Sequence, residues 1–285
     1  MASVVVGVDG SAGSLAAVDL AAREAALRDQ PLRVVHAFTW PYLDVALGPA
    51  VLGPPEGGLR QAAERIVAEA LDRATGTQPD VRVTGEVVTG VPAAVLVQES
   101  STAVLVVVGD RGLGGFTGLL IGSVAVQVTA HAGCPVLVAR GTAHPDGTVL
   151  LGVDGSPASE TAVGFGFAEA ALRGVPLTAL HTWTHASRAG YEAPEAEAEE
   201  ARVLAEALAG WHDKYPDVPV HRRLIRGRAR PTLIEATSRA QLAVVGGRGL
   251  GGFTGLLLGS VSQAVLHHAA CPVAVVPDIH GGEQS

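Results

Sequence analysis

Two glycine-rich stretches contain the residues of this sequence that are best suited to bind a ligand. They read GDRGLGGFTGLLIGS from Gly109 to Ser123 and GGRGLGGFTGLLLGS from Gly246 to Ser260, and they differ only at their second and thirteenth positions. Glycine permits positive φ angles and lets backbone N–H groups face inward, and concave groups of amides bind phosphate. A helical pattern follows each stretch, and the first N–H groups of a helix also attract anions. The sequence therefore predicts a phosphate-binding loop in each half.

Two better-known phosphate-binding loops are excluded by their spacing. A P-loop requires Gly-Lys-Ser/Thr, and no glycine here precedes a lysine. The dinucleotide-binding fingerprint requires GxGxxG after the first strand, whereas the first strand here ends in GVDGS. The remaining alternative is a flexible connection whose glycines only turn the chain, which a recent duplication could have preserved. The near identity of the two copies favours ligand binding.

The chain is an internal duplication, so the elements that position the two loops occur twice. The aspartates of the two GVDGS segments align at an offset of 145 residues, whereas the two glycine loops align at an offset of 137. The second half is therefore eight residues shorter between its second strand and its glycine loop. The segment RGTAHPDGT is a short linker rich in Gly, Pro and Asp. We expect two domains, residues 1–141 and 147–279.

Strand-like and helix-like segments alternate along each half. In the first half the apolar, β-branched runs SVVVGVD, PLRVVHAF, DVRVTGEVV, TAVLVVVG and PVLVAR are typical of strands. Helical spacing occurs over Ser14–Leu27 and Leu59–Ala74, and shorter helices begin near Pro92 and near Leu119. The second half repeats this order, with an Ala/Glu-rich helix over Glu192–Ala209. The alternation predicts the α/β class, with two tandem, doubly wound domains that each contain a mostly parallel five-stranded sheet.

Composition and charge exclude several classes of protein. The formal net charge is −8, Lys214 is the only lysine and no basic stripe is present, which argues against nucleic-acid binding. The cluster HRRLIRGRAR is interpreted as a solvent-exposed strand edge. No apolar run reaches the ~20 residues of a membrane helix and no signal peptide is recognised, so we expect no membrane association and a cytoplasmic location. Cys134 and Cys271 each precede a proline and are interpreted as small buried residues rather than reactive thiols.

The spacing within the loops carries a resemblance to a known family. Both loops fit the pattern G-x2-G-x9-G-[ST], and the first strand of each half ends in GVDGS. With these motifs the chain resembles the universal stress protein family, specifically its tandem-domain, ATP-binding branch, over essentially its whole length. The resemblance implies the adenine nucleotide alpha hydrolase-like fold of that family and one adenine-nucleotide pocket in each half.

The resemblance also implies which residues hold the nucleotide. The phosphates would be bound by loop glycines and by the serine after the last of them, namely Gly109, Gly112, Gly122, Ser123, Gly246, Gly249, Gly259 and Ser260. Asp9 and Asp154 would face the ribose or a phosphate-bound Mg²⁺. Ala37 and Thr182 would give backbone contacts to adenine. The pockets would further include Gly7, Arg111, Gly114, Gly115, Val124, Gly152, Arg248, Gly251, Gly252 and Val261.

One departure from the family pattern changes the charge of the first loop. Members often carry Ser after the first loop glycine, whereas this chain has Asp110 and Gly247. Asp110 adds negative charge beside the expected phosphate site and would weaken it unless Mg²⁺ or Arg111 compensates. For Arg111 and Arg248, a phosphate contact and a solvent-facing position stay equally open.

The two aspartates have a structural alternative. Each could serve a turn or cap the following helix, although Ser156 and Pro157 resemble a helix start that would take this role from Asp154. We favour the ligand-binding role for both aspartates.

Histidines and tryptophans near the predicted pockets are interpreted as structural. His36 and His181 lie in apolar strands and are expected to be hydrogen-bonded interior residues. Trp40 and Trp183 could roof a base, and we favour the alternative that they cover the core. Complementing a helix dipole is favoured over metal binding for the histidines near helix ends, His131, His267 and His268.

The function predicted from these features is that of an ATP-binding regulatory module in stress response. ATP, alone or with Mg²⁺, is the expected ligand, and no catalytic base or metal-binding carboxylate set is recognised. The alternatives are a slow Mg²⁺-dependent ATPase or phosphate-transfer enzyme, and a scaffold with empty pockets. Duplicated domains usually pair about a pseudo-twofold axis, and the resemblance implies contact through the last strands and a further dimerisation. We expect a homodimer and a regulatory protein partner of unknown identity.

Overall fold

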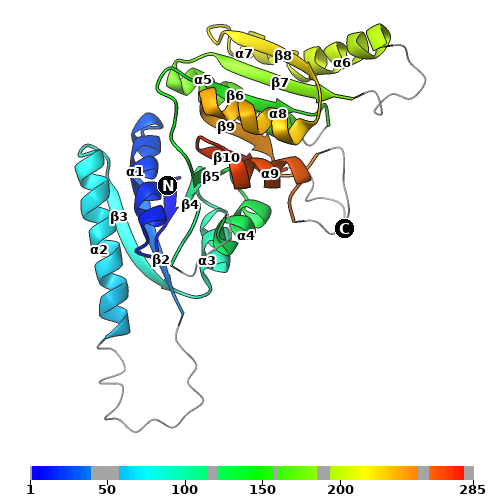
Figure 1. The fold of residues 1–285 in the computed structure, drawn as a ribbon. Helices are drawn as coiled ribbons and strands as arrows, with labels where there is room; N and C mark the ends of the chain where they lie inside the picture. The colour runs from blue at the N-terminus through cyan, green and yellow to red at the C-terminus, as the bar shows by residue number, and fades with distance from the viewer. Residues whose placement is uncertain are drawn as a thin grey trace. The chain divides into compact units, whose positions relative to one another are not determined.

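The computed structural model describes residues 2–39, 58–113, 121–156, 159–184, 193–249 and 257–278. The chain divides into an N-terminal unit, residues 1–128 and 132–139, and a C-terminal unit, residues 129–131 and 140–285. Each unit contains a five-stranded parallel sheet with helices on both of its faces (Figure 1). The predicted α/β class and the two tandem, mostly parallel sheets are therefore confirmed.

In the N-terminal unit the strand order is β3-β2-β1-β4-β5, and all neighbouring strands are parallel. The elements in chain order are β1 (Val4–Gly7), α1 (Ala12–Leu27), β2 (Leu32–Phe38), α2 (Leu59–Thr77), β3 (Val83–Thr89), α3 (Pro92–Glu99), β4 (Leu105–Gly109), α4 (Ser123–His131) and β5 (Val136–Ala139). The central strands β1 and β4 are buried on both faces, as their continuous apolar runs predict.

The C-terminal unit repeats this topology with the order β10-β9-β6-β7-β8. Its elements are β6 (Thr148–Val153), α5 (Glu160–Arg173), β7 (Leu177–Trp183), α6 (Ala193–Ala207), α7 (Trp211–Lys214), β8 (Val220–Arg226), α8 (Ala229–Ala236), the 3₁₀ helix η3 (Thr237–Arg239), β9 (Ala240–Gly246), α9 (Ser260–His268) and β10 (Val273–Val276). In the described ranges no helix combines the length and the apolar character that a membrane crossing requires.

Two helix starts differ from their predicted positions because of the residues before them. Helix α1 begins at Ala12 rather than Ser14, since Ser11 is the N-cap and its hydroxyl accepts the N–H of Ser14 at 3.1 Å. Helix α4 begins at Ser123 rather than near Leu119. Here Gly122 is the N-cap residue and has an extended backbone, with φ −74° and ψ 149°.

The strand order reverses at the middle of each sheet, and this reversal creates a place for a ligand. From β1 the chain moves to β2 on one side and later returns to β4 on the other side. Helices α1 and α2 pack together on one face, while α3 and α4 lie on the other (Figure 1). The connections that leave β1 and β4 therefore diverge at their carboxyl ends, which is where open α/β sheets bind ligands.

Candidate functional site

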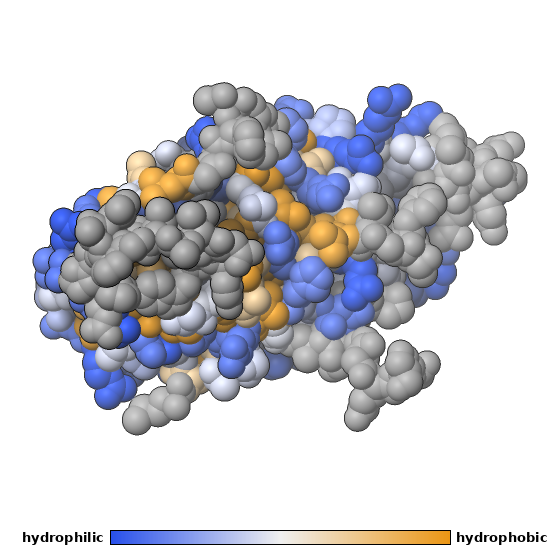
Figure 2. Space-filling model, turned by 90° about the horizontal axis from the view of Figure 1, so that it is seen from below, coloured by the Kyte–Doolittle hydropathy of each residue, from blue (hydrophilic) through white to orange (hydrophobic). Residues whose placement is uncertain are grey.

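Each unit has a cavity at the carboxyl ends of its central strands. The cavity volume is about 770 Å³ in the C-terminal unit and about 490 Å³ in the N-terminal unit. Both lie within the range of roughly 300–1,000 Å³ that is usual for small-molecule sites. Apolar side chains form part of the walls, for example Leu96 in one unit and Leu233 in the other. Figure 2 shows that hydrophobic residues (orange) also reach the viewed surface between hydrophilic ones (blue).

The structure brings all the predicted site residues that it describes to these two cavities. The first cavity contains Gly7, Asp9, Ala37, Gly109, Arg111, Gly112, Gly122, Ser123 and Val124. The second contains Gly152, Asp154, Thr182, Gly246, Arg248, Gly249, Gly259, Ser260 and Val261. Four predicted residues lie outside the described residues, namely Gly114, Gly115, Gly251 and Gly252. A direct contact between any of these residues and a nucleotide stays a prediction.

Asp9 fixes the start of the first glycine loop. Its carboxylate accepts the N–H of Ser11 at 3.0 Å and the N–H of Leu113 at 2.8 Å. A Cβ atom at Gly112 would collide with the same carboxylate, so only glycine lets the loop approach it this closely. The turn role considered as an alternative for this aspartate is therefore present in the structure, and it leaves the carboxylate on the cavity wall.

The hydrogen bonds of Asp9 keep its carboxylate charged. Burial raises the pKa of this carboxyl group, but the hydrogen bonds from Ser11, Leu113 and Ser14 outweigh burial and hold the pKa below its ordinary value of 3.8. Asp9 is therefore an anion at neutral pH. A phosphate group beside it needs compensating N–H groups, arginines or a cation.

Asp154 occupies the same place in the C-terminal unit. It accepts the N–H of Ser156 at 2.9 Å and the Ser156 hydroxyl at 2.7 Å, and a Cβ atom at Gly249 would collide with its carboxylate. The expectation that Ser156 caps the next helix is wrong, because the hydroxyl of Ser156 bonds to Asp154 and the residue preceding α5 is Ser159. Pro157, the other residue of that prediction, lies outside the described residues.

Three described loop glycines, Gly109, Gly112 and Gly249, are required by close approach to neighbouring atoms. Among the described residues no glycine of either loop has a positive φ, so the predicted use of positive φ is wrong for Gly109 and Gly112. The prediction for Gly114, Gly115 and Gly118 falls on residues outside the described ones. At Gly109 a Cβ atom would lie 2.6 Å from the carbonyl carbon of Gly13 and 2.9 Å from the backbone nitrogen of Ser14. The end of β4 therefore packs directly on the backbone at the start of α1, which brings the loop next to Asp9.

The amino ends of α4 and α9 complete the loops. The N–H of Gly122 donates to the carbonyl of Asp110 at 2.7 Å, and that of Gly259 donates to Gly247 at 2.8 Å, so both chains turn the same way into the helix. No side chain caps either helix among the described residues. The first N–H groups of a helix have no acceptor within the helix, and here the residues that carry them line the cavities. The arrangement can bind an anion.

The histidines of β2 and β7 bond to the neighbouring central strand, and His181 also lines the cavity of the C-terminal unit. The Nδ1 atom of His36 is 2.7 Å from the carbonyl oxygen of Val8, and that of His181 is 2.8 Å from the carbonyl oxygen of Val153. The interpretation as hydrogen-bonded strand residues is confirmed. Because a carbonyl only accepts, Nδ1 must carry the hydrogen in both histidines.

His181 has a second partner that sequence reasoning missed. Its Nε2 atom is 2.9 Å from a carboxylate oxygen of Glu200, and both side chains are buried on the cavity wall. Since Nδ1 already donates to Val153, one more proton must lie between Nε2 and Glu200. The pair therefore carries no net charge and gives this cavity a polar wall. Glu200 is one of many glutamates in an Ala/Glu-rich helix, so nothing in its sequence context marks it.

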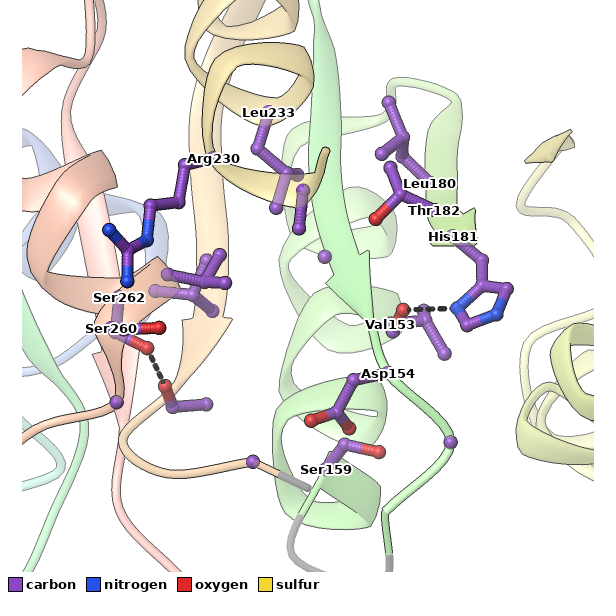
Figure 3. Close-up of a pocket in the computed structure, with 18 of the residues that line it drawn as sticks. Val153, Asp154, Ser159, Leu180, His181, Thr182, Arg230, Leu233, Ser260 and Ser262 are labelled. Atoms are coloured by element: carbon purple, nitrogen blue, oxygen red, sulfur yellow. Dashed lines mark hydrogen bonds between the residues drawn. The ribbon is translucent and has the colours of Figure 1, made fainter. Parts of the chain in front are cut away.

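A second residue that sequence reasoning missed is Arg230, at the end of the cluster HRRLIRGRAR. Strand β8 is the edge strand of its unit and its arginines are exposed, as predicted. Arg230, however, belongs to α8 and lines the cavity. Figure 3 shows its side chain extending toward Ser260 and Ser262, with His181 on the opposite side of the cavity and Asp154 between them. The alignment contained a signal, because the corresponding residue of the first half is Ala93.

The remaining predicted residues have structural places. Trp183 is buried, also borders the cavity, and carries the Arg226 guanidinium 5.7 Å from the centre of its ring, while Trp40 lies outside the described residues. The helix-end histidines occupy the last turns of their helices as expected, and within the described ranges no group of three His, Cys, Asp or Glu side chains could hold a metal ion.

Comparison with known proteins identifies the family. The sequence profile of the Universal stress protein family matches residues 1–140 and 147–277. A universal stress protein of Mycolicibacterium smegmatis is 43% identical over 286 residues, with 96% of each chain covered. The chain belongs to the universal stress protein family. A universal stress protein of Mycobacterium tuberculosis is 42% identical over 285 residues, covering 95% of this chain and 96% of that protein.

Solved universal stress proteins share the tandem fold. The crystal structure of one from Archaeoglobus fulgidus has a TM-score of 0.71 at 18% identity and covers 97% of this chain and 98% of its own. Universal stress proteins solved in complex with cAMP and with dAMP also match, each over 48% of this chain, with TM-scores of 0.37 and 0.35. Those two ligands are properties of those proteins.

Proposed function

We propose that both units of this universal stress protein bind ATP and that nucleotide occupancy regulates a partner in a stress response. One observation carries the proposal. In each unit a glycine loop, an aspartate and the amino end of a nine-residue helix meet around one cavity where the strand order reverses. Backbone N–H groups in this arrangement suit phosphates. The apolar part of each cavity wall suits a purine base.

Mg²⁺ fits these cavities as an ion carried by the nucleotide. Mg²⁺ usually keeps several waters and binds one or two carboxylates together with phosphates. Each cavity offers one aspartate next to the loop, Asp9 or Asp154, whose oxygens already accept N–H groups of the chain. When bound, the ion would neutralise phosphate charge beside this carboxylate.

The single aspartate next to each loop favours a binding module over an ATPase. Hydrolysis requires a positioned water and stabilisation of charge at the γ-phosphate. Asp9 is held by two backbone N–H groups and has a lowered pKa, so it is a weak base. The chain's own residues therefore bind and orient a nucleotide, and occupancy at a hundred times Kd would stabilise the folded unit by about 2.7 kcal/mol.

The proposal is tested by nucleotide binding in variants of the loop. We expect denatured, freshly purified protein to release adenine nucleotide, and calorimetry to show ATP binding in the stripped protein. Gly112→Ala and Gly249→Ala place a methyl group against the aspartates and should each weaken ATP binding at least about tenfold, because the loop must move. Gly76→Ala is the matched control, because no atom lies within 4 Å of its added methyl group.

Two outcomes would overturn this proposal. The first is that stripped protein shows no saturable binding of ATP at millimolar concentration, with or without Mg²⁺. The second is substantial ATP turnover that is abolished by Asp9→Ala together with Asp154→Ala, which would make the protein an enzyme.

We further propose that the chain forms a homodimer in the cytoplasm and that the partner which reads nucleotide occupancy is a protein. The internal duplication supports the dimer, because repeated surfaces tend to associate about twofold axes. The cytoplasmic location and the identity of the partner stay predictions from the sequence.

A further inference from the structure

The two cavities correspond residue by residue, which makes their differences informative. The N–H of Gly90 donates to Phe38 and that of Gly227 donates to Trp183, each at 2.9 Å, so the helices that follow begin at the same place in the two units. Three residues beyond these glycines, the N-terminal unit has Ala93 where the C-terminal unit has an arginine. Ala93 is buried and uncharged.

That arginine, Arg230, is not explained by the stability of its helix. It lies in the first turn of α8, where the helix dipole disfavours a positive charge. It forms no ion pair with any other described residue, and it borders the cavity. In Figure 3 its guanidinium end lies on the side of the cavity where Ser260 and Ser262 begin α9. This is the side on which phosphates would meet the helix.

The arginines of the two glycine loops also make the C-terminal cavity more positive than the N-terminal one. Arg111 borders the first cavity, but it pairs with Asp110 at 3.6 Å. The C-terminal unit has Gly247 at the position of Asp110, and among the described residues Arg248 makes no ion pair. Asp110 therefore cancels a charge that remains available in the other unit.

The charged side chains near the two loops therefore give net charges of opposite sign. In the N-terminal unit Asp9 and Arg111 line the cavity and Asp110 pairs with Arg111 beside it, so these three side chains carry one net negative charge. In the C-terminal unit Asp154, Arg230 and Arg248 line the cavity, and together they carry one net positive charge. The His181–Glu200 pair adds no net charge, and in Figure 3 His181 lies on the opposite side of the cavity from Arg230.

We infer that the units select nucleotides by phosphate number. The C-terminal unit binds nucleoside triphosphates, with Arg230 contacting the terminal phosphates. The N-terminal unit favours nucleotides with fewer phosphates, because its loop carries net negative charge. This inference rests on the proposed nucleotide binding of both units and adds the ligand class of each.

The test measures binding of ATP and AMP to the full-length protein by calorimetry, in which two classes of site should appear. One class should prefer ATP over AMP and lose affinity as salt is raised, since attraction between exposed charges is screened. The other should show the reverse preference. Trp183 borders the C-terminal cavity, so in a Trp40→Phe/Trp211→Phe variant a change of its fluorescence assigns the ATP-preferring class to that unit.

Arg230→Gln should raise the Kd for ATP in the C-terminal unit about tenfold and the Kd for AMP less than about threefold, because only a polyphosphate reaches the guanidinium. Arg228→Gln is the matched control. Arg228 is an exposed arginine at the start of the same helix and is not among the residues that line the cavity. Its ATP and AMP affinities should equal those of the wild-type protein.

Asp110→Asn tests the other unit. The change removes the charge that faces Arg111 and should strengthen ATP binding in the N-terminal unit about threefold to tenfold, with less effect on AMP. The double variant Asp110→Asn/Arg230→Gln should bring the ATP-to-AMP preferences of the two sites closer together.

The outcomes separate this inference from the proposed function. Two sites with equal ATP-to-AMP preference in the wild-type protein would overturn the inference and leave nucleotide binding intact. The same holds if Arg230→Gln weakens ATP and AMP equally, or changes neither. Absence of any saturable nucleotide binding would instead overturn the proposed function. Thermal melting of each variant without ligand excludes a folding defect as the cause.

Discussion

At the residue scale, Asp9 and Asp154 belong to the loops that they border. Each carboxylate accepts backbone N–H groups of the turn after its strand, and each leaves no room for a Cβ atom at the loop glycine opposite. Both carboxylates are half-buried, where hydrogen bonds offset the loss of water, and the hydrogen bonds of Asp9 also lower its pKa. The same charge that organises the loop must therefore be balanced when a phosphate binds.

The lowered pKa of Asp9 predicts a defined loss of stability in acid. A carboxyl group whose pKa is lower in the folded state stabilises the fold above its unfolded pKa of about 3.9, and this contribution disappears as the pH falls through the folded pKa. Asp9→Asn should therefore cost about 1–2 kcal/mol at pH 7 and progressively less below pH ~4. Urea unfolding at a series of pH values measures the difference.

Asp80→Asn provides the comparison for this series. Asp80 is exposed, and its side chain forms no ion pair or hydrogen bond with another described residue. Its replacement should therefore leave the unfolding free energy within about 0.5 kcal/mol of the wild-type value. A constant difference between Asp9→Asn and the wild-type protein from pH 7 to pH 3 would contradict the role of the charge.

At the element scale, β5 and β10 each begin directly after a Cys-Pro pair whose cysteine is buried in the core. Cys134 and Cys271 are free and buried, as the sequence predicted. Burial raises the pKa of Cys134 to about 11 and that of Cys271 to about 12, and backbone hydrogen bonds only partly offset it. These thiols are packing residues at the start of a strand.

The raised pKa values predict thiols that do not react in the native protein. The thiolate is the nucleophile, and at pH 8 a thiol with a pKa of about 11 is ionised in only about one molecule in a thousand. We expect both cysteines to react with an aromatic disulfide reagent only as fast as the protein opens, and at once in denaturant. The variant Cys134→Ser assigns the remaining reaction to Cys271. Rapid stoichiometric labelling of native protein would contradict the burial.

At the scale of the whole molecule, the two duplicated units keep the same fold but differ in side chains at their cavities. The two units share strand order, parallel pairing and the position of the cavity. They differ at residues that line or flank the cavity, including Ala93 and Arg230. Sheet order is maintained by many buried contacts, whereas a side chain at the rim of a cavity can change with little effect on the fold.

The proposed homodimer is a prediction about the whole molecule. Sedimentation equilibrium of the full-length protein at micromolar concentration should give twice the chain mass of 28.9 kDa. A single species with the mass of one chain at that concentration would refute the dimer. Repeating the run with saturating ATP asks whether occupancy shifts the association.

The sequence by itself determined the elements, their order and the position of the loops, because these follow from local periodicity, turn residues and an internal repeat. Most predicted strands and helices lie where the structure has them, within a few residues at their ends. The pattern of loop glycines, together with GVDGS, was sufficient to indicate the family.

Only the tertiary structure decided why the glycines are needed and which distant side chains enter the cavities. The contact of Gly109 with Gly13, the bond from Leu113 to Asp9 and the position of Arg230 join residues that are far apart along the chain. Local sequence patterns report the conformation of neighbouring residues. The approach of remote segments depends on how whole helices pack on the sheet, and this packing is a property of the complete fold.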